Sequence, residues 1–164
     1  MDAETLTVVG EIGSDELSSP HDVVMDDQGR LRVADAGSNR VALFELGEVT
    51  GRLVGELSDG VGRPDGIAQG PDGRVFVTSV GRSHFTVFRD GRRVSRAGGS
   101  GPNQYRRPHH IDVDDMGRVI AADPGNNRLH VLSPDLEFQL SIGGPPPHDF
   151  DEPKYFALDE VGRL

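Results

Sequence analysis

Two histidines occupy equivalent places in this sequence, and their type and spacing point to metal chemistry. His21 and His109 each follow a proline, and their positions differ by 88 residues. Neutral imidazole is a common zinc ligand, and three protein ligands with an open fourth position make a catalytic type of zinc site. The pair therefore marks a candidate metal site, with zinc as the candidate ion, that needs a third ligand.

The two histidines belong to an internal repeat that must position them. Prolines recur at Pro20, Pro64, Pro108 and Pro153, at intervals of 44, 44 and 45 residues. Asp65 and Lys154 hold the position after proline in the units without histidine. A period near 44 residues is typical of four-stranded propeller blades and also of some helical repeats.

Apolar alternation decides between these architectures. Val23 and Met25 recur at every second position, as do Ile111 and Val113 in the third unit, which is the period of a strand. Asp-x-x-Gly and Gly-Asn-Asn strings between the alternating runs are typical of tight turns. In the first unit we expect strands at 23–26, 31–34, 40–44 and 53–57. The sequence therefore predicts an all-β meander, repeated along the chain.

The repeat resembles the NHL-repeat β-propellers. The resemblance rests on a proline, an apolar strand, Asp-x-x-Gly and the strings Ala34–Arg40 and Ala122–Arg128, which read ADAGSNR and ADPGNNR. It implies blades of four antiparallel strands, and NHL propellers commonly close as six-bladed rings. The 164 residues supply about 3.7 blades of 44 residues. We therefore expect an open arc that is a fragment of a six-bladed ring.

The repeat also sets the boundaries within this single region. They are a lead-in at 1–19 with an orphan outer strand at 5–13, blade 1 at 20–63, blade 2 at 64–107, blade 3 at 108–152 and an incomplete blade 4 at 153–164. Repeats bury their apolar faces against their neighbours, so an open arc is expected to leave one bare face at each end. Such edges favour self-association.

The strand after each proline is innermost in a propeller blade, so the residue after proline should lie near the axis. His21, Asp65, His109 and Lys154 are therefore expected around one axial mouth. Asp112 takes a position that is apolar in the other units, Val24 and Ala68 among them. A buried carboxylate needs a partner, so Asp112 is expected either to meet an arginine or to face the axial site.

Other polar residues of the repeat have structural explanations. Asp35 and Asp123 are expected to accept hydrogen bonds from the backbone of the turns that follow them. Arg106 and Arg107 are expected to lie on a solvated turn at the rim.

The Pro-His pattern further resembles the zinc-dependent lyase propeller of the peptidyl-α-hydroxyglycine amidating enzymes. That resemblance implies zinc held by histidines from alternate blades, and only His21 and His109 match it. A non-catalytic scaffold that binds a protein, a peptide or a small ligand at the axial face is therefore the first expectation. The amidating type of lyase, or another axial-metal enzyme, is the alternative.

Composition excludes several other classes. The chain has no cysteine, which removes disulfide and thiolate chemistry. Its net charge of −10 opposes binding to nucleic acid and to anionic membrane surfaces. No apolar run reaches the roughly 18 residues of a membrane helix. The first residues lack the basic and apolar segments of a secretory signal, so a cytoplasmic location is expected.

Overall fold

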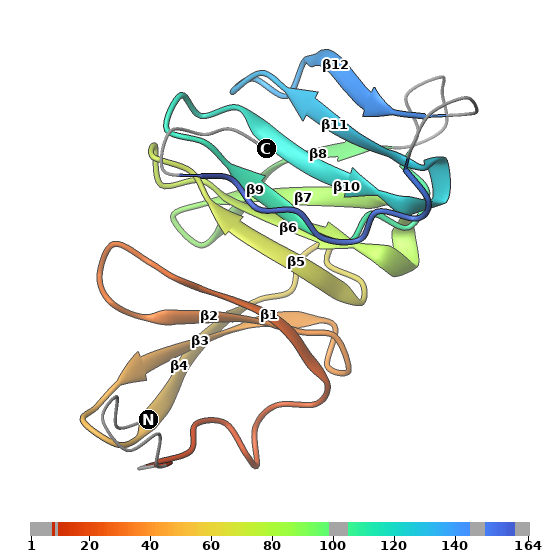
Figure 1. Ribbon diagram of the computed structural model, residues 1–164. Coiled ribbons are helices and arrows are strands. Elements are labelled where there is room, and N and C mark those ends of the chain that lie inside the picture. Colours follow the sequence, from red (N-terminus) through yellow and green to blue (C-terminus); the bar gives the residue numbers. More distant parts are fainter. Residues whose placement is uncertain (1–7, 9, 99–104, 145–149, 160–164) are drawn as a thin grey trace.

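The computed structural model describes residues 8, 10–98, 105–144 and 150–159, and in these the chain is all-β (Figure 1). The strands form three four-stranded antiparallel sheets, each in chain order. Blade 1 contains β1 (Pro20–Met25), β2 (Leu31–Asp35), β3 (Arg40–Leu46) and β4 (Gly51–Leu57); blade 2 contains β5 (Pro64–Gln69), β6 (Val75–Ser79), β7 (His84–Arg89) and β8 (Arg92–Gly98); blade 3 contains β9 (Ile111–Val113), β10 (Val119–Asp123), β11 (Arg128–Leu132) and β12 (Phe138–Gly143). Short 3₁₀ turns, η1 (Val80–Arg82) and η2 (Pro124–Asn126), follow β6 and β10. The prediction of an all-β repeat of four-stranded blades is confirmed.

The first hairpin of each blade shows why the repeat folds this way. Gly29, Gly73 and Gly117 have φ of +73°, +77° and +77°, a backbone conformation that favours glycine. Each glycine N–H donates to the carbonyl oxygen three residues earlier, at 2.8–3.0 Å. The strictly repeated glycine therefore closes the same turn in all three blades.

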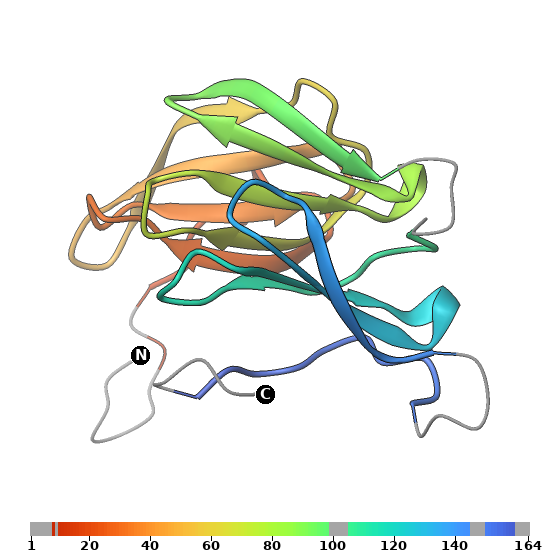
Figure 2. The same cartoon turned by 90° about the horizontal axis from the view of Figure 1, so that it is seen from above.

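The three sheets stand side by side along their inner strands, and β5 lies between β1 and β9 (Figure 1). Seen from above, the blades fan out from these inner strands (Figure 2). The Ile67 N–H donates to Asp22 Oδ2 at 3.0 Å, and the Thr78 hydroxyl donates to the His109 carbonyl oxygen at 2.6 Å. These bonds join neighbouring blades, and the three sheets together form the open arc that the sequence predicts.

Apolar side chains fill both junctions between blades. The junction of blades 1 and 2 is built from buried aliphatic residues and one aromatic ring, Phe88. The junction of blades 2 and 3 is richer in aromatic residues, with Phe76, Phe85 and Tyr105 all at most 5% exposed. The rings of Phe76 and Phe85 lie 6.5 Å apart, edge to face. Each sheet therefore buries its face against the next, as repeat proteins require.

The segment before β1 covers the outer face of blade 1. Ile12 and Leu17 pack against Val33 and Phe44, which are 7% and 0% exposed. Residues 8 and 10–13 form no strand, so the orphan outer strand expected at 5–13 is wrong where the structure describes it. Residues 5–7 and 9 of that prediction lie outside the described residues.

The segment after residue 150 covers the outer face of blade 3. Phe156 and Leu158 pack against its buried core, which includes Ile120 and Leu129. The Lys154 carbonyl oxygen accepts the His110 N–H at 3.2 Å, so this segment runs along blade 3 without forming a strand. The end of the incomplete fourth unit, 160–164, lies outside the described residues.

These two segments correct the expectation of a bare apolar face at each end of the arc. The centres of both outer sheets are buried by the chain itself. Apolar exposure remains at their margins, for example at Met25 (57%) and Leu140 (48%). Self-association through these edges stays a prediction, and the exposed apolar surface that would drive it is smaller than the sequence suggested.

Candidate functional site: the axial mouth

The structure brings three of the expected axial residues together, one from each blade. The Asp65 carboxylate lies between the two imidazoles, with Oδ2 2.9 Å from His21 Nδ1 and Oδ1 3.2 Å from His109 Nδ1. The Asp65 side chain is 7% exposed, that of His109 is 14% exposed and that of His21 is 34% exposed. The repeated position after proline therefore places three titratable groups in one cluster.

The shared carboxylate fixes which nitrogen of each ring carries a proton. An ionised carboxylate only accepts hydrogen bonds, so both Nδ1 atoms must be N–H donors. In a neutral imidazole this leaves Nε2 with a lone pair. His109 Nε2 is buried and has no hydrogen-bond partner among the described residues. Leaving a buried polar atom unpaired is unfavourable, so a hydrogen-bond donor that reached this atom would be stabilising.

A cavity of about 190 Å³ opens beside this cluster. Its lining combines the cluster with small apolar residues and two arginines: His21, Ala36, Arg63, Pro64, Asp65, Val80, Arg107 and His109. Neither arginine has an ion-pair partner in the part of the chain that the structure describes. The cavity is smaller than the usual sites for drug-sized ligands, so it suits a single chemical group.

The two arginines were missed by sequence reasoning, which placed Arg107 on a solvated turn. Both precede a repeat proline, and the structure gives them φ of +46° and +60°. Ser19 and Glu152 precede the other prolines and have φ of +64° and +45°. Residues other than glycine rarely adopt this conformation. The signal in the sequence was a second repeated slot, one residue before each proline, filled by arginine in the two central units.

Two expected site residues lie elsewhere. The Lys154 side chain is exposed and does not line the cavity, while its carbonyl oxygen accepts the His110 N–H. Asp112 is half-buried, and its Oδ1 accepts the Val113 N–H at 2.8 Å. Within the described ranges, Asp112 has no ion pair with an arginine and does not line the axial cavity.

Asp35 and Asp123 brace the segment that leads into each blade. Asp35 Oδ1 accepts the Ser18 N–H at 2.7 Å, and Asp123 Oδ1 accepts the Arg106 N–H at 2.6 Å. The sequence placed these bonds in the turns that follow. Burial raises the pKa of Asp123, but hydrogen bonds, above all from the His130 side chain, outweigh it and hold that pKa below the ordinary value. Asp123 therefore fixes the backbone at Arg106, next to the cavity-lining residue Arg107.

The donor set at the mouth falls short of a zinc site. His21 and His109 supply two imidazoles, and the carboxylate between them already accepts from both rings. Within 8, 10–98, 105–144 and 150–159, no group of three or more histidine, aspartate or glutamate side chains is arranged to hold a metal ion. Zinc sites use three or four protein ligands. The cluster as it stands is a hydrogen-bonded acid–imidazole array.

Comparisons with known proteins agree on the fold. The NHL repeat model matches residues 17–44, which contain the first three strands of blade 1 up to Phe44. No curated protein matches the sequence. No helix among the described residues is long and apolar enough to cross a membrane.

Solved structures similar to this chain include enzymes and a binding complex. A hydrazine synthase from Kuenenia stuttgartiensis is 18% identical with a TM-score of 0.67, covering 92% of this chain and 40% of that chain. A gluconolactonase from Xanthomonas campestris is 20% identical with a TM-score of 0.58, covering 85% and 51%. A chain of a nidogen/laminin complex is 15% identical with a TM-score of 0.60, covering 77% and 48%.

These similarities are at the level of fold, because all identities are low. The chain spans about two fifths to one half of the length of these structures. The same fold carries catalytic and binding activities among them, so function must be argued from the site. Residues 17–44 match the NHL repeat, and the described part of the chain has the fold of β-propeller blades.

Proposed function

We propose that this chain is a non-catalytic binding module whose axial mouth takes the C-terminal carboxylate of a protein or peptide. The observation that carries the proposal is the buried, unpartnered Nε2 of His109 beside a small cavity flanked by Arg63 and Arg107. A lone pair beside two cationic side chains is complementary to a ligand that presents a hydrogen-bond donor next to a negative charge.

A peptide C-terminus has both features within one residue. Its last backbone N–H can donate to the Nε2 lone pair, and its carboxylate can accept from the arginines. Hydrogen bonds between arginine and carboxylate are among the stronger ones, because both partners are charged. The cavity of about 190 Å³ admits such an end group and leaves the rest of the partner outside.

Local charge supports an anionic ligand despite the acidic chain. The lining residues include two arginines against one aspartate, while the whole chain has a net charge of −10. The mouth is therefore a basic spot on an acidic protein, and local complementarity of this kind favours specificity. A similar propeller fold within a nidogen/laminin complex supports the suitability of the architecture for protein partners.

The test compares two peptides that differ only at the C-terminus, acetyl-Ala-Ala-Gly as the free acid and as the amide. Imidazole resonances recorded by NMR report binding. The free acid is expected to shift the signals of His21 and His109 and to leave those of His84 and His130 in place, because these two are buried away from the mouth. The amide is expected to bind at least tenfold more weakly.

Arginine variants distinguish a specific contact with the ligand carboxylate from a general effect of the protein's charge. Arg63→Gln and Arg107→Gln are each expected to weaken binding of the free acid about fivefold or more, since each removes a charge-assisted bond. Arg96→Gln, at an exposed position on β8, is the matched control and should have no effect. Equal binding of acid and amide, or an equal effect of all three variants, would contradict the proposal.

The zinc-dependent lyase remains the second candidate. It is favoured by one observation: each Nδ1 is bonded to a carboxylate, the usual arrangement around histidines whose other nitrogen binds metal. It needs a third ligand beyond the two imidazoles. Zinc chemistry is therefore open to this chain only if another group completes the ligand set, and zinc binding can be measured directly.

A further inference from the structure

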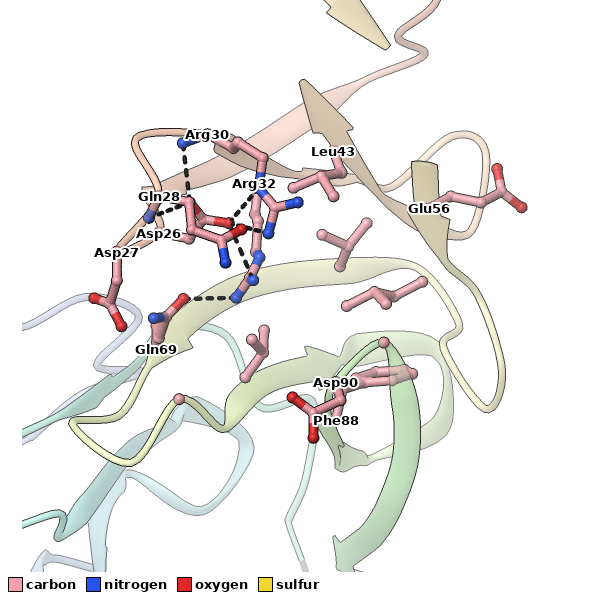
Figure 3. Close-up of a pocket in the computed structure, with 15 residues that line it drawn as sticks. Asp26, Asp27, Gln28, Arg30, Arg32, Leu43, Glu56, Gln69, Phe88 and Asp90 are labelled. Atoms are coloured by element: carbon pink, nitrogen blue, oxygen red, sulfur yellow. Dashed lines mark hydrogen bonds and ion pairs between the residues drawn. The ribbon is translucent and has the colours of Figure 1, made fainter. Parts of the chain in front are cut away.

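A second and larger hollow lies between blades 1 and 2, at the opposite ends of β1 and β5 from the histidine cluster. Figure 3 shows the residues that line it. Its volume of about 460 Å³ falls within the usual range of small-ligand sites. The two turns that close the first hairpins, at 26–30 and 70–74, contribute to its rim, as does the turn between β7 and β8.

Comparison of the repeats explains why this hollow exists. Arg32, Val41 and Gln69 line it, and a shift of 44 residues places Phe76, Phe85 and Val113 at the next junction. There, the two phenylalanines are fully buried and fill the space between blades 2 and 3. At the first junction a valine and two polar side chains leave it open.

The polar side chains at the floor of the hollow already form hydrogen bonds with one another. Arg32 donates to Gln69 Oε1 at 2.6 Å and to Asp26 Oδ2 at 3.1 Å, and its side chain is 15% exposed (Figure 3). Asp26 also accepts from the Arg30 side chain at 2.9 Å. These contacts hold Arg32 in the junction and leave further guanidinium N–H groups that can donate to a carbonyl oxygen.

The walls and the rim have different character. Val41, Leu43 and Phe88 form apolar walls on facing blades. Asp27 and Asp90 are exposed on two rim turns, and neither has an ion-pair partner in the part of the chain that is described. Of the charged lining residues, four are acidic and two are basic. Both basic residues, Arg30 and Arg32, form ion pairs with Asp26.

We propose that this inter-blade hollow binds a peptide segment in which a bulky apolar residue adjoins a lysine or arginine. The apolar side chain enters between Leu43 and Phe88, the basic side chain meets Asp27 or Asp90, and a peptide carbonyl oxygen accepts from Arg32. The charge of the rim is complementary to such a segment. This site is separate from the axial mouth, and the proposal does not depend on the function proposed there.

The test uses peptides with blocked ends, which lack the carboxylate that the axial mouth is proposed to recognise. Acetyl-Gly-Leu-Lys-Gly-amide is expected to bind and to shift the methyl resonances of Leu43 and Leu57. Replacement of lysine by glutamate, or of leucine by glycine, is expected to weaken binding at least tenfold. The signals of His21 and His109 should stay unchanged.

Matched variants locate the site by its charge. Asp27→Asn and Asp90→Asn are each expected to weaken binding about two- to fivefold, as for exposed ion pairs. Asparagine is the appropriate replacement at position 90, because it tolerates the φ of +52° found there. Asp115→Asn is the control, since Asp115 is the exposed residue at the same position in blade 3. It should leave binding unchanged.

A filled junction tests the hollow itself. Arg32→Phe combined with Val41→Phe introduces the residues of the next junction and is expected to reduce binding more than tenfold in a folded protein. If that variant does not fold, the peptide series and the charge variants still show whether the hollow binds the peptide. Equal binding of the lysine and glutamate peptides, shifts at the axial histidines, an effect of Asp115→Asn equal to that of Asp27→Asn, or no binding at millimolar peptide would overturn the proposal.

Discussion

Asp123→Asn should be one of the most destabilising conservative substitutions in this protein. The Asp123 side chain is fully buried and accepts from four groups. The donors are the Arg106 N–H at 2.6 Å, the Asn126 side-chain amide at 2.6 Å, the His130 Nε2 at 3.0 Å and the Arg128 Nε at 3.4 Å. Asparagine offers one acceptor oxygen in place of two and turns an N–H₂ group toward donors.

The magnitude follows from the bonds that cannot be remade. If the remaining oxygen keeps the Arg106 N–H, the donors at Oδ2 lose their acceptor. Hydrogen bonds to a charged group contribute about 1.5–3 kcal/mol each, and removal of one partner from a buried ionic cluster costs about 3–5 kcal/mol. We expect a loss of about 4 kcal/mol in the free energy of unfolding. For a chain of this size, that corresponds to a fall in Tm of roughly 8–16 °C.

Asp35→Asn is the matched control at the same position of blade 1. Asp35 accepts the Ser18 N–H and Arg40 Nε, and asparagine can keep the first bond. Arg40 retains the Glu56 carboxylate at 2.9 Å and the Glu16 carbonyl oxygen at 2.6 Å. The expected loss is therefore smaller, about 1–2 kcal/mol.

The effect at Asp123 should depend on pH, because its pKa in the folded protein lies below the ordinary value of 3.8. A lowered pKa contributes stability that is complete above the unfolded value and is lost as pH falls through the folded value. The difference between wild type and Asp123→Asn should therefore be full at pH 7 and narrow below about pH 4. Urea unfolding followed by circular dichroism at several pH values measures it. A difference that is constant down to pH 3, or a larger loss for Asp35→Asn, would refute the reasoning.

Three further predictions concern the axial site and the charge. Gly66→Ala should destabilise the protein by about 1–3 kcal/mol, because a Cβ there would lie 2.5 Å from the His109 carbonyl oxygen; Gly55→Ala, whose Cβ would meet only Leu43 at 3.9 Å, should be nearly neutral in thermal melts. Zinc should bind weakly, since two imidazoles are too few for a tight site; a one-to-one complex that survives dialysis and is lost in His21→Ala and His109→Ala would show that the ligand set is complete. RNA should not bind at submicromolar concentration in about 150 mM salt, because the net charge of −10 repels phosphate; a filter-binding curve with a submicromolar midpoint would contradict this.

Spacing along the chain is enough to predict the blades and their order. The prolines, the alternating apolar residues and the repeated glycines at 29, 73 and 117 are local signals, and each acts through backbone geometry that depends on few neighbours. The period also placed His21, Asp65 and His109 in one slot of successive blades. Strand positions and the shared axial face could therefore be predicted from spacing alone.

How the side chains at those repeated positions meet depends on contacts between blades, which spacing does not predict. Asp65 joins both imidazoles because the three blades meet along their inner strands, whereas Lys154, at the same repeat position, is exposed and does not line the cavity. The segment that covers the outer face of blade 1 carries no repeat signal, since Ile12 and Leu17 act through packing rather than through a strand pattern. The hollow between blades 1 and 2 depends on the volumes of Val41 and Arg32 against a facing sheet. Packing of this kind is a property of neighbours in space, and the order of residues along the chain does not specify it.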